Sequence, residues 1–257
     1  EGKLAIVTAA SGGLGYATAE ALAAEGAAVA ICSREGERAE GAAARIREAT
    51  DATVHAFAAD VSDASSLEAF FAAATGALGG LDVLVCNAGG PPPGGFEKLG
   101  EEAWERAFQL TLMSVSRSVR HALPHFRARG GGRVLAIASS SVKRPLDNLL
   151  LSNVFRPAVH GLCKSLSVEL APHNVQVNVL APGRIETERI NELDRARASR
   201  DGTSFEAVRA ATIAEIPMGR LGQPQEFGRV AAFLCSPAAL YLNGVTLLVD
   251  GGAVTSL

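Results

Sequence analysis

Short, wholly apolar runs alternate along the chain with longer stretches in which apolar residues recur at helical spacing. An apolar run without polar alternation is typical of a strand buried on both faces, and helices between such strands indicate a parallel sheet. Right-handed crossovers then predict a Rossmann-like, doubly wound α/β sheet of seven mostly parallel strands with helices on both faces and ligands beyond the strands' carboxyl ends. The predicted strands are residues 4–7, 28–32, 54–58, 83–86, 134–138, 175–180 and 245–249.

One segment interrupts this alternation. Residues 184–217 are charged and show only a weak helical pattern, and they are long enough to form a substrate lid over a ligand cleft. A pair of surface helices is the alternative. Residues 1–257 are expected to form a single domain, because the many Ala and Gly residues let helices pack closely on one sheet.

Composition and charge argue against several classes of function. A net charge of −3 and a pI near 6.0 are unlike a nucleic-acid surface, which needs a basic patch. The chain has no long unbroken apolar segment, so no membrane partner is expected. Its four cysteines lie far apart and lack metal-ligand spacing, which predicts neither a metal site nor a disulfide framework and favours the reducing cytoplasm.

The first predicted strand runs directly into a glycine-rich turn and a helix, TAASGGLGYATAEAL over residues 8–22. Such a turn lets backbone amides approach a diphosphate, and the start of the helix supplies partial positive charge. The same pattern also joins strands to helices where no ligand binds. At this position in a doubly wound sheet it predicts dinucleotide binding, with contacts from Thr8, Ser11, Gly13, Leu14 and Gly15.

Six motifs at successive strand ends resemble those of the short-chain dehydrogenase/reductase family, in register along almost the whole chain. The family's glycine turn is TGxxxGxG, and here Ala9 replaces its first glycine. A methyl group there is a small perturbation if the backbone φ is negative and a costly one if φ is positive. The matching residues are Thr8, Gly13 and Gly15, then Asp60-Val61, Asn87-Ala88-Gly89, Ser139, Pro182-Gly183 through Thr187, and Asn243-Gly244 through Asp250-Gly251-Gly252.

The resemblance implies a nicotinamide dinucleotide along these strand ends. It places Asp60 at the adenine ring, Asn87 beside the adenosine ribose, and the Ile185 backbone and Thr187 hydroxyl at the nicotinamide carboxamide. These residues also have structural interpretations, with Asp60 as a helix cap and Asn87 as a bond between two strands. The neighbouring residues Val61, Gly89, Pro182 and Gly183 are expected to complete the cofactor contacts. The structural interpretation of Pro182-Gly183 is a plain turn.

The end of the second predicted strand indicates which cofactor is used. NAD sites place an acidic residue there, because a carboxylate accepts from the ribose 2′-hydroxyl and repels a 2′-phosphate. Ser33 and Arg34 stand at this point, and a hydroxyl beside a guanidinium can bind phosphate through charge-assisted hydrogen bonds. NADP is therefore favoured and NAD is the alternative, since Arg34 could instead stack on adenine or face solvent.

The resemblance also implies a catalytic set that this chain only partly keeps. The family uses a serine, a tyrosine as general acid, a lysine that lowers the phenol's pKa and binds ribose, and an asparagine that supports a water chain. Ser139 matches the serine, whereas Ser152 stands in the tyrosine's place, Arg156 in the lysine's and Thr111 in the asparagine's. Because an aliphatic hydroxyl is a far weaker acid than a phenol, Ser152 cannot simply take over the proton transfer. Arg156 keeps a positive charge that could grip ribose hydroxyls.

Other residues are candidates for the missing proton donor. Lys143 follows the fifth predicted strand in a loop that should border the substrate, where partial desolvation would bring its titration toward neutrality. Solvation is the alternative, and with Arg144 or Arg156 this lysine could instead clamp an anionic substrate. His160 could face the cleft or pack elsewhere, and Pro157 predicts a helix that is kinked or starts late.

Two functions from different classes fit these residues. The first is an NADP(H)-dependent oxidoreductase that reduces a small-molecule carbonyl or oxidises a hydroxyl. The chain resembles a divergent β-ketoacyl-carrier-protein-reductase-like branch, which implies a 3-oxoacyl-like substrate. The second is a dinucleotide-binding sensor or assembly subunit with little catalysis, which the loss of three catalytic residues favours. The resemblance further implies a homo-oligomer, a tetramer or a dimer, formed through the helices after the fourth and fifth strands and through the C-terminal strand.

Overall fold

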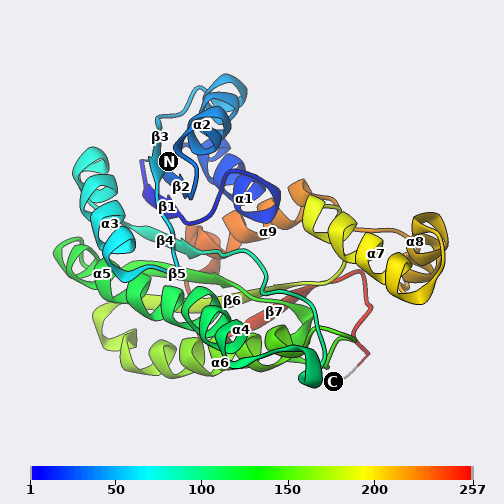
Figure 1. Ribbon diagram of the computed structural model, residues 1–257. Coiled ribbons are helices and arrows are strands. Elements are labelled where there is room, and N and C mark those ends of the chain that lie inside the picture. Colours follow the sequence, from blue (N-terminus) through cyan, green and yellow to red (C-terminus); the bar gives the residue numbers. More distant parts are fainter. Residues whose placement is uncertain (1, 256–257) are drawn as a thin grey trace.

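The computed structural model describes residues 2–255, which form one seven-stranded sheet (Figure 1). All neighbouring strands are parallel, in the spatial order β3-β2-β1-β4-β5-β6-β7. The predicted Rossmann-like doubly wound sheet is confirmed, with small changes at the ends of four of the seven strands. The strands are β1 (Leu4–Val7), β2 (Ala28–Ser33), β3 (Val54–Ala58), β4 (Val83–Cys86), β5 (Gly132–Ile137), β6 (Val175–Pro182) and β7 (Thr246–Val249).

One α-helix follows each strand from β1 to β6, except that α4 and α5 both follow β4, and α7, α8 and α9 follow β6. Short helical turns lie in the connections between these elements. A π-helical turn is η2 (Phe108–Met113), and the 3-10 turns are η1 (Phe96–Lys98), η3 (Ser140–Val142), η4 (Ala171–His173) and η5 (Pro237–Ala239). The α-helices are α1 (Gly13–Ala24), α2 (Gly36–Thr50), α3 (Ala64–Leu78), α4 (Glu101–Ala107), α5 (Ser114–Ala128), α6 (Leu150–Glu169), α7 (Glu188–Asp201), α8 (Phe205–Ala214) and α9 (Pro224–Cys235).

Two apolar cores lie on opposite faces of the sheet. Helices α1, α2 and α9 cover one face, and α3, α5 and α6 cover the other (Figure 1). Successive strand residues point to opposite cores, so that Val83 and Val85 join the first core while Leu84 and Cys86 join the second. Since both faces of the inner strands are covered, their runs are apolar without alternation, as the sequence pattern predicts, and the edge strands β3 and β7 are partly exposed.

Small residues let the helices approach closely. A Cβ built on Gly228 of α9 would collide with the carbonyl oxygen of Ala17 on α1, so these two helices pack backbone against backbone. Among residues 2–255, no helix is both long enough and apolar enough to cross a membrane.

Residues 184–217 contain the helix pair α7 and α8, which stands out from the sheet at the right of Figure 1. The helix-pair interpretation of this segment is therefore confirmed, and its movement as a lid stays a prediction. Asp194 on the buried face of α7 holds the pair together, because it accepts a 2.8 Å hydrogen bond from Nε of Arg209 on α8.

Helix α6 begins at Leu150, seven residues before Pro157, so the predicted late start is wrong and the kink stays a prediction. Proline lacks an N–H and its ring crowds the carbonyl four residues earlier, so the carbonyl of Asn153 is left without its usual helical hydrogen bond. The first turn is instead anchored from outside the helix, because the Asn153 side chain bonds the preceding loop at Leu146.

Candidate active site

The carboxyl ends of β1 and β4 are tied together by side chains of the two predicted cofactor motifs. The Thr8 hydroxyl donates to the Asn87 carbonyl at 2.7 Å and accepts from the Asn87 N–H at 2.9 Å. The Asn87 amide donates to the Ala9 carbonyl at 2.9 Å. The structural interpretation of Asn87 as a bond between strands is confirmed, and its contact with the adenosine ribose stays a prediction.

Glycines make room for this arrangement and for a ligand above it. A Cβ on Gly15 would lie 2.6 Å from Asn87 Nδ2 and 2.8 Å from the Ala9 carbonyl oxygen, so α1 can start here only without a side chain. Gly13 has a φ of 56°, and no side chain caps α1 at Gly12. A Cβ at Gly12 would meet only open space. The free amides at the start of α1 therefore face an open track that fits a diphosphate.

Ala9 carries backbone strain in this turn. Its φ is 49°, in the left-handed region that alanine adopts at a cost of about 1–2 kcal/mol. Its carbonyl is held by Asn87, and its N–H donates to the buried Cys32 sulfur at 3.4 Å. The replacement of the family's first glycine is therefore a costly one.

The predicted adenosine end lies beyond β2 and β3. Ser33 is half-buried at the end of β2 and Arg34 is exposed. The Asp60 carboxylate accepts from both the N–H and the hydroxyl of Ser62, at 2.9 and 2.6 Å. The residue that caps α3 is Asp63, which accepts from the Ser66 N–H at 2.7 Å, so the helix-cap interpretation of Asp60 is wrong.

Ser139 and Ser152 lie on neighbouring segments joined by Ser141, a residue that the sequence did not single out. The Ser139 hydroxyl oxygen accepts from the Ser141 N–H at 3.1 Å, and the Ser141 hydroxyl donates to the Ser152 carbonyl at 3.4 Å. Both Ser139 and Ser152 are half-buried. Since Ser139 uses only its oxygen in this contact, its hydroxyl proton remains available to a ligand.

Arg156 is buried in the place where the family's lysine is expected. Only 8% of its surface is exposed, its Nη1 donates to the Ile137 carbonyl at 2.8 Å, and its Nε has no partner among the described residues. None of the ion pairs among residues 2–255 includes Arg156. Burial, and secondarily the charge of Arg189, lowers the pKa of Arg156 to about 10. A buried guanidinium without a carboxylate costs stability, which points to a ligand-binding role.

Thr111 is also buried without a partner for its hydroxyl, in the π-helical turn η2 that packs on α6. Single π-helical turns occur frequently at functional sites. Thr111, at the asparagine position, and Arg156, at the lysine position, thus each have a buried polar atom without a hydrogen-bond partner among the described residues. The two elements that carry them, η2 and α6, are in contact.

Two other candidates lie away from a catalytic environment. Lys143 is exposed, so the desolvation on which its role as an acid depends is absent. The Nδ1 of His160 lies 2.6 Å from the Thr246 hydroxyl on β7, so the interpretation of His160 as a packed residue is confirmed.

The segment after β6 crosses over the cofactor track. The Thr187 side chain lies 3.6 Å from the position that a Cβ on Gly13 would take. Arg189, two residues later, donates from Nη2 to the Pro91 carbonyl at 2.7 Å and lies against Gly90 in the loop after β4. Thr187 therefore borders the start of α1, and Arg189, which sequence reasoning missed, joins this segment to the loop after β4. The cofactor contacts of Gly89, Pro182 and Gly183 stay predictions.

Backbone hydrogen bonds join the two loops that border the predicted substrate side. Gly94 in the loop after β4 donates to the Asn148 carbonyl at 2.8 Å and accepts from the Leu150 N–H at 3.3 Å. Asn153 fastens the second loop, since its side chain accepts from the Leu146 N–H at 2.9 Å and donates to the Leu146 carbonyl at 2.8 Å. Asn153 is a further residue that sequence reasoning missed, because its role depends on a loop that folds back over α6.

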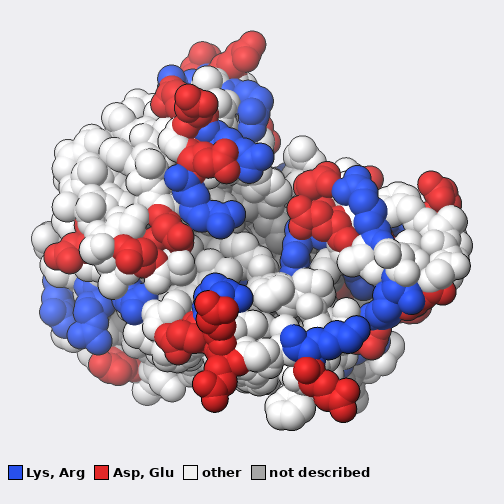
Figure 2. Space-filling view, viewed as in Figure 1, with Lys and Arg blue, Asp and Glu red and all other residues white. Residues whose placement is uncertain are grey.

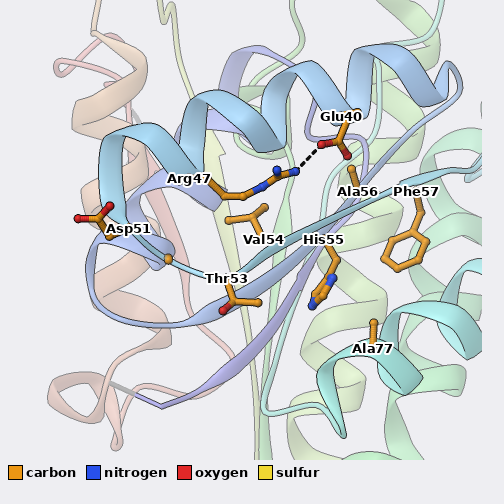
Figure 3. A pocket seen from close by; sticks show the side chains of 10 residues that line it. Glu40, Arg47, Asp51, Thr53, Val54, His55, Ala56, Phe57 and Ala77 are labelled. Carbon is orange, nitrogen blue, oxygen red and sulfur yellow. Dashed lines mark hydrogen bonds and ion pairs between the residues drawn. The ribbon is translucent and has the colours of Figure 1, made fainter.

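The surface is hollowed between the α1–α2 half and the α7–α8 pair, with basic side chains near the edges of the hollow (Figure 2). A cavity of about 420 Å³ lies beside the predicted substrate loops, lined by residues that include Leu149 and Arg184. A second, shallower cavity of about 690 Å³ lies along β3 beneath α2. Figure 3 shows Arg47 and Glu40 paired above Thr53 and His55 in its lining. None of the predicted site residues lines the cavity at β3, so it is not the active-site candidate.

Comparisons with known proteins agree with this geometry. A family model described as enoyl-(acyl carrier protein) reductase matches residues 8–254. Dehydrogenase/reductase SDR family member 4 of Oryctolagus cuniculus is 35% identical over 99% of this chain and 95% of its own length. The 3-oxoacyl-[acyl-carrier-protein] reductase FabG of Vibrio cholerae is 35% identical over 98% of this chain and 97% of its own length. L-Sorbose reductase from Gluconobacter frateurii, solved with NADPH and L-sorbose, has a TM-score of 0.95 and 31% identity, covering 100% of this chain and 98% of that one.

Replacing Ala9 by glycine is expected to stabilise the protein by up to about 1 kcal/mol, because glycine adopts a positive φ without strain. Urea denaturation measures the change. Ala10→Gly is the matched control: its φ is not positive and its side chain is buried, so it should destabilise by a similar amount. An unchanged or lower midpoint for Ala9→Gly would contradict the assignment of strain.

Arg156→Met is expected to raise the free energy of unfolding by about 1 kcal/mol or more, because it removes a buried charge that no carboxylate compensates. Arg129→Met is the contrasting variant. It removes a 2.7 Å bond to the buried Asp82 carboxylate and should destabilise the protein. If both variants lose stability alike, the charge of Arg156 is compensated within the protein.

Proposed function

Because the chain belongs to the short-chain dehydrogenase/reductase family of oxidoreductases, we propose that it interconverts a carbonyl and a hydroxyl group of a small molecule with NADP(H). The observation that carries this proposal is the open track between the start of α1 and the segment after β6, bordered by the expected cofactor residues. A 3-oxoacyl-like carbonyl is the proposed substrate type, supported by the likeness to the Vibrio cholerae reductase.

The chain's own residues would hold the cofactor along this track. Amides at Ser11 to Gly13 would bind the diphosphate, with Leu14 and Gly15 shaping the turn. Asp60 would border the adenosine, while Ile185 and Thr187 would hold the nicotinamide end. Bound NADPH would supply a hydride to the carbonyl carbon. Arg156 would reach the ribose hydroxyls, which gives its free guanidinium donors their missing partners.

A different catalytic set follows from the exchanged residues. Ser139 would donate a hydrogen bond from its hydroxyl to the substrate oxygen and keep its proton, since its own oxygen already accepts from the Ser141 N–H. The charge of Arg156 would stabilise the negative charge that develops on that oxygen. Ser152 would orient the loop through Ser141 rather than transfer a proton. Water would supply the proton, because Lys143 lacks the burial that a catalytic lysine needs.

A homo-oligomer, a tetramer or a dimer, is the proposed assembly, supported by apolar side chains exposed around β7. Tyr241 and Leu240 are exposed in the segment before β7, and Leu247 is partly exposed on β7. A cytoplasmic location stays a prediction, supported by four free, buried cysteines.

The cofactor choice makes a direct prediction. Arg34→Glu should weaken NADPH binding by about 10-fold or more, because it removes a charge-assisted hydrogen bond to the 2′-phosphate and adds a repelling charge. NADH binding should be unchanged or stronger, and isothermal titration calorimetry measures both. Arg38→Glu is the control, since Arg38 is exposed on α2 and paired with Glu35. Equal NADPH and NADH affinities in the unchanged protein would contradict the preference.

Catalysis by the chain is tested with NADPH and a panel of 3-oxoesters, keto acids and quinones, following the absorbance of the reduced nicotinamide. Ser139→Ala should lower kcat/KM by about 100-fold, the usual cost of losing one donor to a developing oxyanion. Ser165→Ala, an exposed serine on α6, should leave it unchanged. NADPH binding without turnover of any substrate would overturn the enzyme and favour the cofactor-binding alternative.

A further inference from the structure

The cavity of about 420 Å³ has a lining unlike that of a purely apolar substrate pocket. It is lined by the loop of residues 144–149, by residues of α7, and by Thr212 near the end of α8 with the two lining residues that follow this helix. Arg184, which directly precedes the proposed nicotinamide contact Ile185, is part of its wall. The cavity is therefore bordered by the loops after β4 and β5 and by the residue next to the proposed nicotinamide contact.

Arg184 brings hydrogen-bond donors that the described protein does not use. Its side chain is 30% exposed, and it makes no hydrogen bond with any residue in the range 2–255. The nearest carboxylate is Asp194, at 3.6 Å from Nη1, and that carboxylate already accepts the 2.8 Å bond from Arg209. Burial lowers the pKa of Arg184, and Asp194 only partly offsets the effect.

Thr212 adds a second unused donor to the lining of the cavity. It is 3% exposed, lines the cavity, and its hydroxyl has no partner among the described residues. A helical threonine commonly bonds the carbonyl four residues before it, here that of Val208, and Thr212 does not. A buried hydroxyl left without a partner costs about 1–3 kcal/mol, so a ligand atom is the expected partner.

The acidic residues of the lining do not balance these donors. Four arginines and three acidic residues face the cavity. Arg200 pairs with Asp147 and Asp201, Arg197 also pairs with Asp201, and Asp194 is shared between Arg184 and Arg209. Glu215 is exposed at the surface. Of the four lining arginines, Arg144 and Arg184 make no side-chain hydrogen bond with residues 2–255, so their donors are left for a ligand. Apolar side chains complete the wall, which suits a ligand with one anionic group and an apolar body: Leu146, Leu149, Leu193 and Ile216.

We propose that this cavity binds the carboxylate of the substrate, so that the protein acts on oxo carboxylates (or the corresponding hydroxy carboxylates) in preference to their neutral esters. The Arg184 guanidinium and the Thr212 hydroxyl donate to the carboxylate oxygens, and the leucines contact the carbon chain. The proposal rests on the proposed oxidoreductase function for the carbonyl. The recognition of the carboxylate is a separate property of the cavity.

Binding without chemistry tests the cavity directly. Pentanoate, which has no carbonyl to reduce, should bind the full chain in calorimetry in the presence of NADP, and its methyl ester should bind at least about 10-fold more weakly. Arg184→Met should weaken pentanoate binding by about 10- to 100-fold, the effect of one charge-assisted hydrogen bond. Arg195→Met, on the exposed side of α7 and paired with Glu188, is the matched control and should bind normally.

Thr212→Val separates recognition from folding, because valine has the shape of threonine without the hydroxyl. The variant should be as stable as the unchanged protein or more stable, while its pentanoate affinity falls about 3- to 10-fold. Pentanoate binding that is equal in the unchanged protein, Arg184→Met and Thr212→Val would overturn the proposal.

Kinetics then distinguish this proposal from the proposed function. For a 3-oxo acid and its methyl ester, the acid should have at least about 10-fold higher kcat/KM, and Arg184→Met should abolish the preference through KM. An ester turned over as well as the acid would overturn the carboxylate site alone. Pentanoate binding that depends on Arg184, with no hydride transfer to any substrate, would support the site and overturn the oxidoreductase.

Discussion

The mutual tie between the ends of β1 and β4 is the constraint on which the candidate site depends. Thr8 and Asn87 exchange two hydrogen bonds, and the Asn87 side chain holds the carbonyl of Ala9. This tie keeps the glycine turn in a shape that alanine adopts only under strain, and it brings α1 so close that Gly15 can carry no side chain. Strained backbone of this kind persists only where surrounding bonds over-determine it. The amides at the start of α1 consequently point into open space.

Positive charge without matching carboxylates is the second feature of the site. Arg156 is buried with a single carbonyl contact, and Arg189 is near enough to lower its pKa. The Arg184 side chain makes no hydrogen bond with residues 2–255, and the carboxylate nearest to it, that of Asp194, lies 3.6 Å from its Nη1. Buried donors without acceptors cost folding free energy, and in a protein of marginal stability such a cost is retained where function requires it. The phosphates of a dinucleotide and an anionic substrate are chemically suited to these donors.

Hydrogen bonds to main-chain groups of the loops build the wall of the substrate side. Gly94 pairs with the loop before α6, Asn153 fastens that loop at Leu146, and Arg189 bonds the carbonyl of Pro91. Because these contacts join segments far apart in the chain, they hold the cleft in one shape although its loops contain little regular structure. The exchange of the family's tyrosine and lysine therefore leaves the walls of the site intact.

The sequence by itself determined the doubly wound sheet, because unbroken apolar strands and glycine turns are local patterns that only a sheet buried on both faces satisfies. It also located the cofactor motifs, since these follow strand ends in order. Only the tertiary structure decided the sign of φ at Ala9, the burial of Arg156, the exposure of Lys143 and the crossing of Arg189. Backbone strain, desolvation and hydrogen-bond satisfaction depend on which segments, distant in the sequence, come into contact in the folded protein. No local sequence pattern encodes these contacts.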